Sequence, residues 1–65
     1  HDVEDVLLED FSDEIDGWII DIFKNIGFDT AKSVLKADFN YLVKQTDLEE
    51  ETIREVIKIL EVEFN

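Results

Sequence analysis

The chain has 65 residues and a net charge of −12, with 18 acidic side chains against six basic ones. Binding to nucleic acids or to anionic membranes relies on Lys and Arg, so this charge argues against both. A basic protein surface is the partner that the charge suits best, although acidity that only maintains solubility is the alternative. The absence of cysteine excludes disulfides and thiolate zinc sites. The sequence has no methionine and starts at His1, so we expect it to be part of a longer protein.

The N-terminal quarter of the chain is its most acidic part, because residues 1–16 contain no Lys or Arg. Apolar residues nevertheless recur there every four positions, which is typical of a short helix packed on a core: Val3, Leu7 and Phe11. We expect residues 1–11 to form an acidic linker or a short strap helix. Residues 12–65 are then the folded domain.

The first firm helix is predicted over residues 13–25, with Ser12 as its N-cap. Its apolar residues follow one stripe with the spacing of a helix that faces a core: Ile15, Trp18, Ile19, Ile22, Phe23 and Ile26. This stripe places Trp18 in the core and leaves Ile20 on the exposed side. Gly27 is predicted to end the helix, because glycine adopts a positive φ without a steric penalty.

Three further helices are expected after this turn. Asp29 or Thr30 is predicted to cap a short helix over residues 30–36. Asp38 is predicted to cap a third helix over residues 39–45, on which Tyr41 lies away from the apolar face and is partly exposed. The last helix is predicted over residues 50–63. Proline is absent and no useful stretch alternates with the period of a strand, so the predicted class is all-α.

A weak internal repeat connects the two turns of the predicted fold. In both, a turn residue, an apolar residue and an acid precede a helix: Gly27-Phe28-Asp29 and Asp47-Leu48-Glu49. Two stacked helix–hairpin–helix units in a small four- to five-helix domain account for this pattern. The alternative is that any two capped amphipathic helices look alike.

Residues for catalysis, cofactors or metal binding are not found in the sequence. Residues 12–23 resemble a calcium-binding loop, but the position of its last, bidentate ligand holds Phe23, which cannot bind calcium. The only histidine is His1, which argues against nucleophile–histidine pairs and histidine metal sites. Hairpins that bind DNA have a second glycine two residues after the first, and here that position holds Asp29. We therefore expect a protein that is not an enzyme and that takes neither cofactor nor metal.

The order of helices and turns resembles a known family. The segments Trp18-Ile19-Ile20-Asp21 and Leu42-Val43-Lys44-Gln45-Thr46-Asp47-Leu48-Glu49-Glu50-Glu51-Thr52 are similar to the C-terminal acidic repeats of the bacterial transcription termination/antitermination factor NusA, in Bacteroidetes-like bacteria. These repeats are tandem helix–hairpin–helix modules that follow an acidic linker. The likeness covers about residues 6–64. It departs from the family at Asp47, where the second hairpin usually has glycine; aspartate tolerates left-handed backbone better than most residues.

The resemblance implies a cytoplasmic protein-interaction module of an elongation or termination factor. Its implied partners are the C-terminal domain of the RNA polymerase α subunit, another elongation-complex protein, or the basic RNA-binding domains of the same factor. Gly27 is expected to form the structural turn. We expect the partner to contact the acidic hairpin edges, which consist of Asp29, Thr30, Asp47, Glu49, Glu50 and Glu51. The alternative is a generic SAM-like protein-interaction domain unrelated to transcription.

Overall fold

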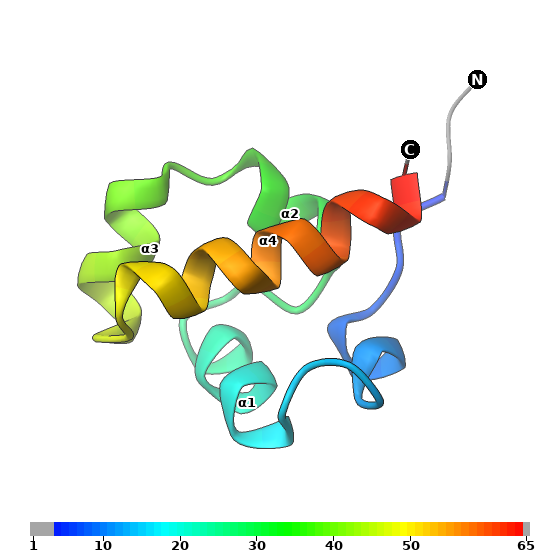
Figure 1. The fold of residues 1–65 in the computed structure, drawn as a ribbon, viewed down its shortest axis with the longest axis horizontal. Coiled ribbons are helices and arrows are strands. Elements are labelled where there is room, and N and C mark those ends of the chain that lie inside the picture. The colour runs from blue at the N-terminus through cyan, green and yellow to red at the C-terminus, as the bar shows by residue number, and fades with distance from the viewer. Residues whose placement is uncertain (1–3, 65) are drawn as a thin grey trace.

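The computed structural model describes residues 4–64. The elements in chain order are a 3₁₀-helix and four α-helices (Figure 1): η1 (Leu8–Phe11), α1 (Gly17–Asn25), α2 (Ala31–Lys36), α3 (Phe39–Thr46) and α4 (Glu50–Phe64). Within residues 4–64 the only extended pairing is an isolated bridge between Leu7 and Thr30. The predicted all-α class is confirmed.

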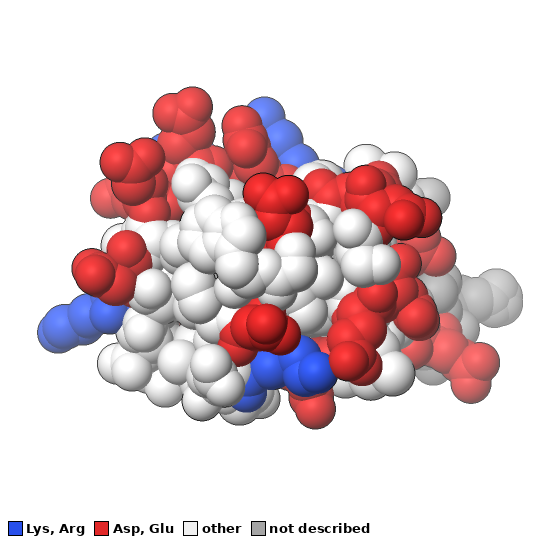
Figure 2. All heavy atoms as spheres, turned by 90° about the horizontal axis from the view of Figure 1, so that it is seen from below, with Lys and Arg blue, Asp and Glu red and all other residues white. Residues whose placement is uncertain are grey.

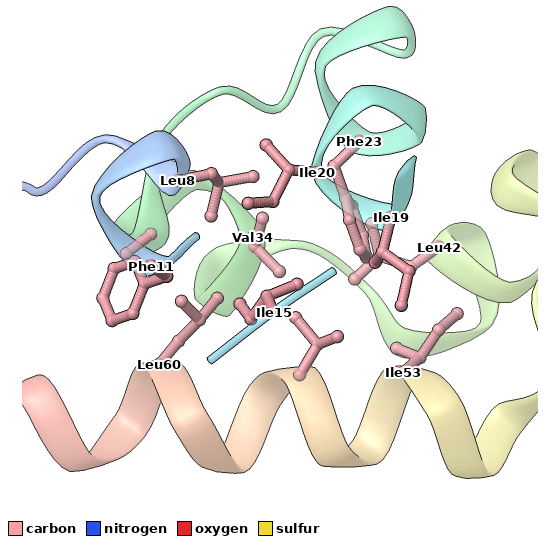
Figure 3. Close-up of a cluster of buried hydrophobic side chains, with 12 residues drawn as sticks. Leu8, Phe11, Ile15, Ile19, Ile20, Phe23, Val34, Leu42, Ile53 and Leu60 are labelled. Carbon is pink, nitrogen blue, oxygen red and sulfur yellow. The ribbon is translucent and has the colours of Figure 1, made fainter. Parts of the chain in front are cut away.

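The longest helix, α4, organises the packing. Helices α2 and α3 pack against it and η1 packs against α1, while α1 lies below α4 in the view of Figure 1. The core between these elements is drawn in Figure 3, and its fully buried side chains include Phe23, Leu8, Leu42, Ile53, Leu60 and Val34. None of the helices in the described part of the chain has both the length and the apolar character needed to cross a membrane.

Helix α1 begins four residues later than the sequence predicts, so the expected start at residue 13 is wrong. The Phe11 carbonyl accepts hydrogen bonds from the amides of Glu14 and Ile15, both at 2.8 Å. These bonds extend the turn of η1, and Ser12 is the C-cap of η1 instead of the N-cap of α1. Asp16 is the residue before α1, without a side-chain cap. Ser12 therefore does not cap α1, because the turn that follows η1 buries both Phe11 and Ile15.

The late start of α1 also changes which side chains it buries. Ile15 reaches the core from outside the helix, so the buried face of α1 is centred on Ile19, Ile20 and Phe23. Ile20, expected to be exposed, is only 4% exposed, whereas Trp18, expected in the core, is 57% exposed. Both expectations are wrong, because α1 is oriented so that Ile19, Ile20 and Phe23 face the core and Trp18 faces solvent. Tyr41 is 47% exposed, as predicted.

Gly27 ends α1 as predicted, with a φ of 95°. The amide of Phe28 donates to the Phe23 carbonyl at 2.9 Å, and the amide of Gly27 donates to the Lys24 carbonyl at 3.0 Å. This pair of bonds is the Schellman motif, which satisfies carbonyls that the end of a helix leaves without partners.

The second turn has the same backbone requirement at Asp47. This residue has a φ of 59° and a ψ of 21° at the end of α3, so aspartate takes a left-handed position that usually favours glycine. The Thr46 hydroxyl donates to the Leu42 carbonyl at 2.7 Å and accepts from the amide of Leu48 at 3.2 Å. Asp38 caps α3 as predicted, accepting from the amide of Tyr41 at 3.0 Å.

Replacing each glycine by alanine is expected to change stability in opposite directions. No atom lies within 4 Å of a Cβ added at either position, so backbone conformation decides the outcome. Gly27→Ala forces a left-handed alanine and should destabilise the fold by about 1–2 kcal/mol. Gly17→Ala lies in the first turn of α1 and should stabilise it by up to about 1 kcal/mol. Urea unfolding of both variants checks the signs, and a Gly27→Ala variant as stable as the parent would contradict the turn geometry.

The N-terminal segment is fastened to the start of α2 by backbone and side-chain hydrogen bonds. The amide of Leu8 donates to the Asp29 carbonyl at 3.0 Å, and the amide of Ala31 donates to the Val6 carbonyl at 2.7 Å. The Asp5 carboxylate accepts from the amide of Lys32 at 2.8 Å. With Leu8 and Phe11 buried, residues 5–11 form a strap across the core.

The Asp5 carboxylate makes this fastening dependent on pH. Partial desolvation raises the pKa of Asp5, but hydrogen bonds from the Lys32 amide, the Thr30 hydroxyl and the Val6 amide together lower it below the ordinary value of 3.8. A lowered pKa in the folded state adds stability above the unfolded pKa, and this stability is lost as the pH falls through the folded pKa. Asp5→Ala should therefore lower the midpoint of thermal unfolding at neutral pH, and this loss should shrink as the pH falls below the ordinary pKa of 3.8. A loss that does not change with pH would contradict this role.

Candidate protein-binding surface

Every acidic side chain in residues 4–64 is exposed to solvent. Among these residues only two acids form ion pairs, Glu9 with Lys24 at 2.9 Å and Glu50 with Arg54 at 3.1 Å. Figure 2 shows the lower face of the molecule, where acidic side chains lie around and among uncharged atoms and outnumber the basic ones. The negative charge of the chain is therefore carried on its surface and is little neutralised by its own bases.

Three of the six basic side chains make contacts within the fold. Lys24 joins α1 to Glu9 of η1, and the hydrogen bond and charge of Glu9 raise the pKa of Lys24. The Arg54 guanidinium lies 5.1 Å from the centre of the Phe39 ring, and the Lys32 ammonium lies 5.8 Å from that of Phe64. Such contacts over aromatic faces hold cations in place by attraction to the ring quadrupole.

The first hairpin edge, at Asp29 and Thr30, is partly used for folding. The Thr30 hydroxyl accepts from the amide of Ser33 at 3.3 Å, and the Thr30 amide donates to the Ser33 hydroxyl at 3.4 Å, which forms a capping box. The Asp29 carbonyl is bound to Leu8, while its side chain remains exposed. Thr30 is thus a structural cap, and Asp29 supplies the only carboxylate of this pair.

The second hairpin edge, between α3 and α4, exposes four acidic side chains: Asp47, Glu49, Glu50 and Glu51. The Glu49 carbonyl accepts from the amide of Ile53 at 3.2 Å, so this residue directly precedes the first turn of α4. Glu50 and Glu51 lie in the first turn, where free amides favour carboxylates. Glu50 pairs with Arg54, which leaves the other three acids without an ion pair in the described structure.

The structure does not bring the two edges together. The bridge between Thr30 and Leu7 holds the first edge near the N-terminal strap. Figures 1 and 3 both place this strap toward the C-terminal end of α4, whereas the α3–α4 turn lies at the opposite end. The α3–α4 turn is therefore the denser of two separate acidic edges.

Trp18 is exposed, although the predicted helical stripe places it in the core. Its indole lies on the surface of α1 and contributes one of the large exposed hydrophobic side chains of the domain. Gly17 could have indicated this exposure, because it marks the true start of α1 after a segment rich in acidic residues. In the described part of the chain no group of three or more potential ligand side chains is placed to hold a metal ion.

Comparisons of this chain with models of known protein families, with curated protein sequences and with solved structures find no match. The fold and the charged surface are therefore the basis for the functional interpretation.

Proposed function

We propose that this chain is a non-catalytic protein-interaction module that docks on a basic protein surface. The observation that supports the proposal is the exposure of all described acids, of which only Glu9 and Glu50 have a basic partner within the fold. Unpaired carboxylates on a small domain repel one another. A basic protein surface bound against them is attracted to the carboxylates and reduces their mutual repulsion.

The charge distribution also suits fast recognition. Complementary potentials steer partners toward each other and raise the rate of association, while salt screens the attraction. All of the described carboxylates lie at the surface, where each ion pair contributes little, so the expected complex is moderate in affinity and sensitive to ionic strength. The α3–α4 turn carries the most concentrated set of such groups and is the proposed centre of the contact.

The resemblance to NusA acidic repeats suggests the identity of the partner. On this proposal the module acts in the cytoplasm, in transcription elongation and termination. It contacts the C-terminal domain of the RNA polymerase α subunit, another elongation-complex protein, or the factor's own RNA-binding domains. Asp47, Glu49, Glu50 and Glu51 face the partner, and Asp29 with Thr30 forms a second, weaker edge.

A nuclear magnetic resonance titration tests the proposal. The ¹⁵N-labelled chain is titrated separately with the α C-terminal domain and with the basic RNA-binding domains of the parent factor. Perturbed amide resonances at residues 47–51 with one of these domains at sub-millimolar concentration are the expected result. If neither domain perturbs any resonance, the transcription role is wrong.

Two matched double substitutions test where the partner binds. Glu49→Gln/Glu51→Gln removes two charges from the α3–α4 turn and should weaken binding about three- to tenfold, the range expected for two exposed ion pairs. Glu61→Gln/Glu63→Gln removes the same charge from the other end of α4 and should change the dissociation constant less than about twofold. Equal weakening by both variants would contradict a contact centred on the turn.

A further inference from the structure

A shallow groove with an acidic rim lies between the turn that precedes α1 and the side of α4. Its floor is apolar and its edges carry three carboxylates and a threonine, and the lining residues are Glu14, Ile15, Asp16, Ile19, Thr52, Glu55, Val56 and Ile59. Its volume is about 110 Å³. Sites for small molecules or cofactors usually have about 300–1,000 Å³. The groove is therefore suited to a single aliphatic side chain.

The apolar surface continues beyond the groove on both helices. Trp18 directly precedes Ile19 in the first turn of α1, and Val62 lies one turn after Ile59 on the same side of α4. Trp18 is 57% exposed and Val62 is 74% exposed.

The groove is continuous with the acidic α3–α4 turn. Glu51 precedes Glu55 by one helical turn, so the two carboxylates lie on the same side of α4. Thr52, which lines the groove, directly follows Glu51. A partner bound at the turn therefore reaches the groove without leaving the surface of α4.

From these observations we infer that the groove binds an amphipathic helix of the protein partner, with one apolar side chain on the floor and flanking Lys or Arg side chains on the rim. This inference rests on the proposed function for the class of partner, and it adds the surface and the chemistry of recognition. The apolar side chain of the partner is buried against Ile19, Val56 and Ile59. The carboxylates of Glu14, Asp16 and Glu55 attract the Lys or Arg side chains on either side of it. A second copy of the chain is a poor occupant, because its own acids would face this rim.

Two synthetic helical peptides of equal charge test the occupant. The first has leucines on one face and lysines on either side, and in the second each leucine is replaced by glutamine. The leucine peptide should shift the emission of Trp18, the only tryptophan, to shorter wavelength and perturb the methyl resonances of Ile19, Val56 and Ile59. The glutamine peptide should bind at least tenfold more weakly. Equal affinity of the two peptides would overturn the apolar anchor.

Matched variants of α4 locate the binding surface. Ile57 and Ile59 are both partly buried, but only Ile59 lines the groove. Ile59→Ala should weaken binding of the leucine peptide at least fivefold, and Ile57→Ala should weaken it less than twofold. Equal effects would overturn the inference, as would a concentration-dependent dimer that changes the emission of Trp18. If the basic domains bind the α3–α4 turn while the groove resonances stay unchanged, the proposed function stands and this inference is wrong.

Discussion

Phe23→Ala is expected to remove a large part of the stability of the domain. The Phe23 side chain has no exposed surface and belongs to the core cluster drawn in Figure 3. Truncating a buried phenylalanine to alanine costs about 3–5 kcal/mol, because contacts are lost and a cavity remains. A domain of this size has a total stability of roughly 3–10 kcal/mol. Far-ultraviolet circular dichroism with urea unfolding measures the loss.

The control for this experiment is Trp18→Ala in the same helix. Trp18 is the larger side chain, and the stripe in the sequence places it in the core. Because it is 57% exposed, its removal should cost less than about 1 kcal/mol. A Trp18→Ala variant that unfolds as readily as Phe23→Ala would mean that α1 is rotated with respect to the described fold.

The shortened chain 12–65 is expected to fail to fold, although the sequence divides naturally at this point. Removing residues 1–11 deletes the buried side chains of Leu8 and Phe11 and breaks the hydrogen bonds to Asp29, Ala31 and Lys32. The loss of two such core side chains costs about 5 kcal/mol or more, which is comparable to the whole stability of the domain. A poorly dispersed NMR spectrum of the shortened chain is the expected observation.

Two neighbouring leucines provide a matched test of the strap in the full chain. Leu8 is 1% exposed and Leu7 is 49% exposed. Leu8→Ala should destabilise the domain by about 2–5 kcal/mol and Leu7→Ala by less than about 1 kcal/mol. A stable, well-folded 12–65 chain, or a harmless Leu8→Ala substitution, would show that residues 5–11 are a linker and not part of the core.

The parts of the fold that depend on local chemistry are predictable from the sequence. Gly27 and Asp47 adopt positive φ values at the ends of α1 and α3, and Thr30 and Asp38 cap the helices that follow. Each of these roles depends on one residue type and its immediate neighbours. The bounds of α2, α3 and α4 follow from these residues and agree with prediction within one residue.

The parts that depend on distant contacts are not predictable in this way. The start of α1 is decided by the Phe11 carbonyl, which bonds to Glu14 and Ile15 so that two side chains reach the core. The exposure of the acidic side chains follows from their charge. Which of them lie together on the surface depends on how the helices pack. The groove joins residues 14–19 to residues 52–59, and no local pattern in the sequence indicates that these segments meet.

The salt dependence of binding to the basic partner domain is the most direct test of the proposed role. The dissociation constant of the chain and the α C-terminal domain, or the factor's RNA-binding domains, is measured by calorimetry at about 50 mM and about 250 mM NaCl. Attraction between an acidic and a basic surface predicts binding that weakens about tenfold or more over this range. Binding that is unchanged or stronger at high salt, or no binding to either domain at low salt, would contradict the account.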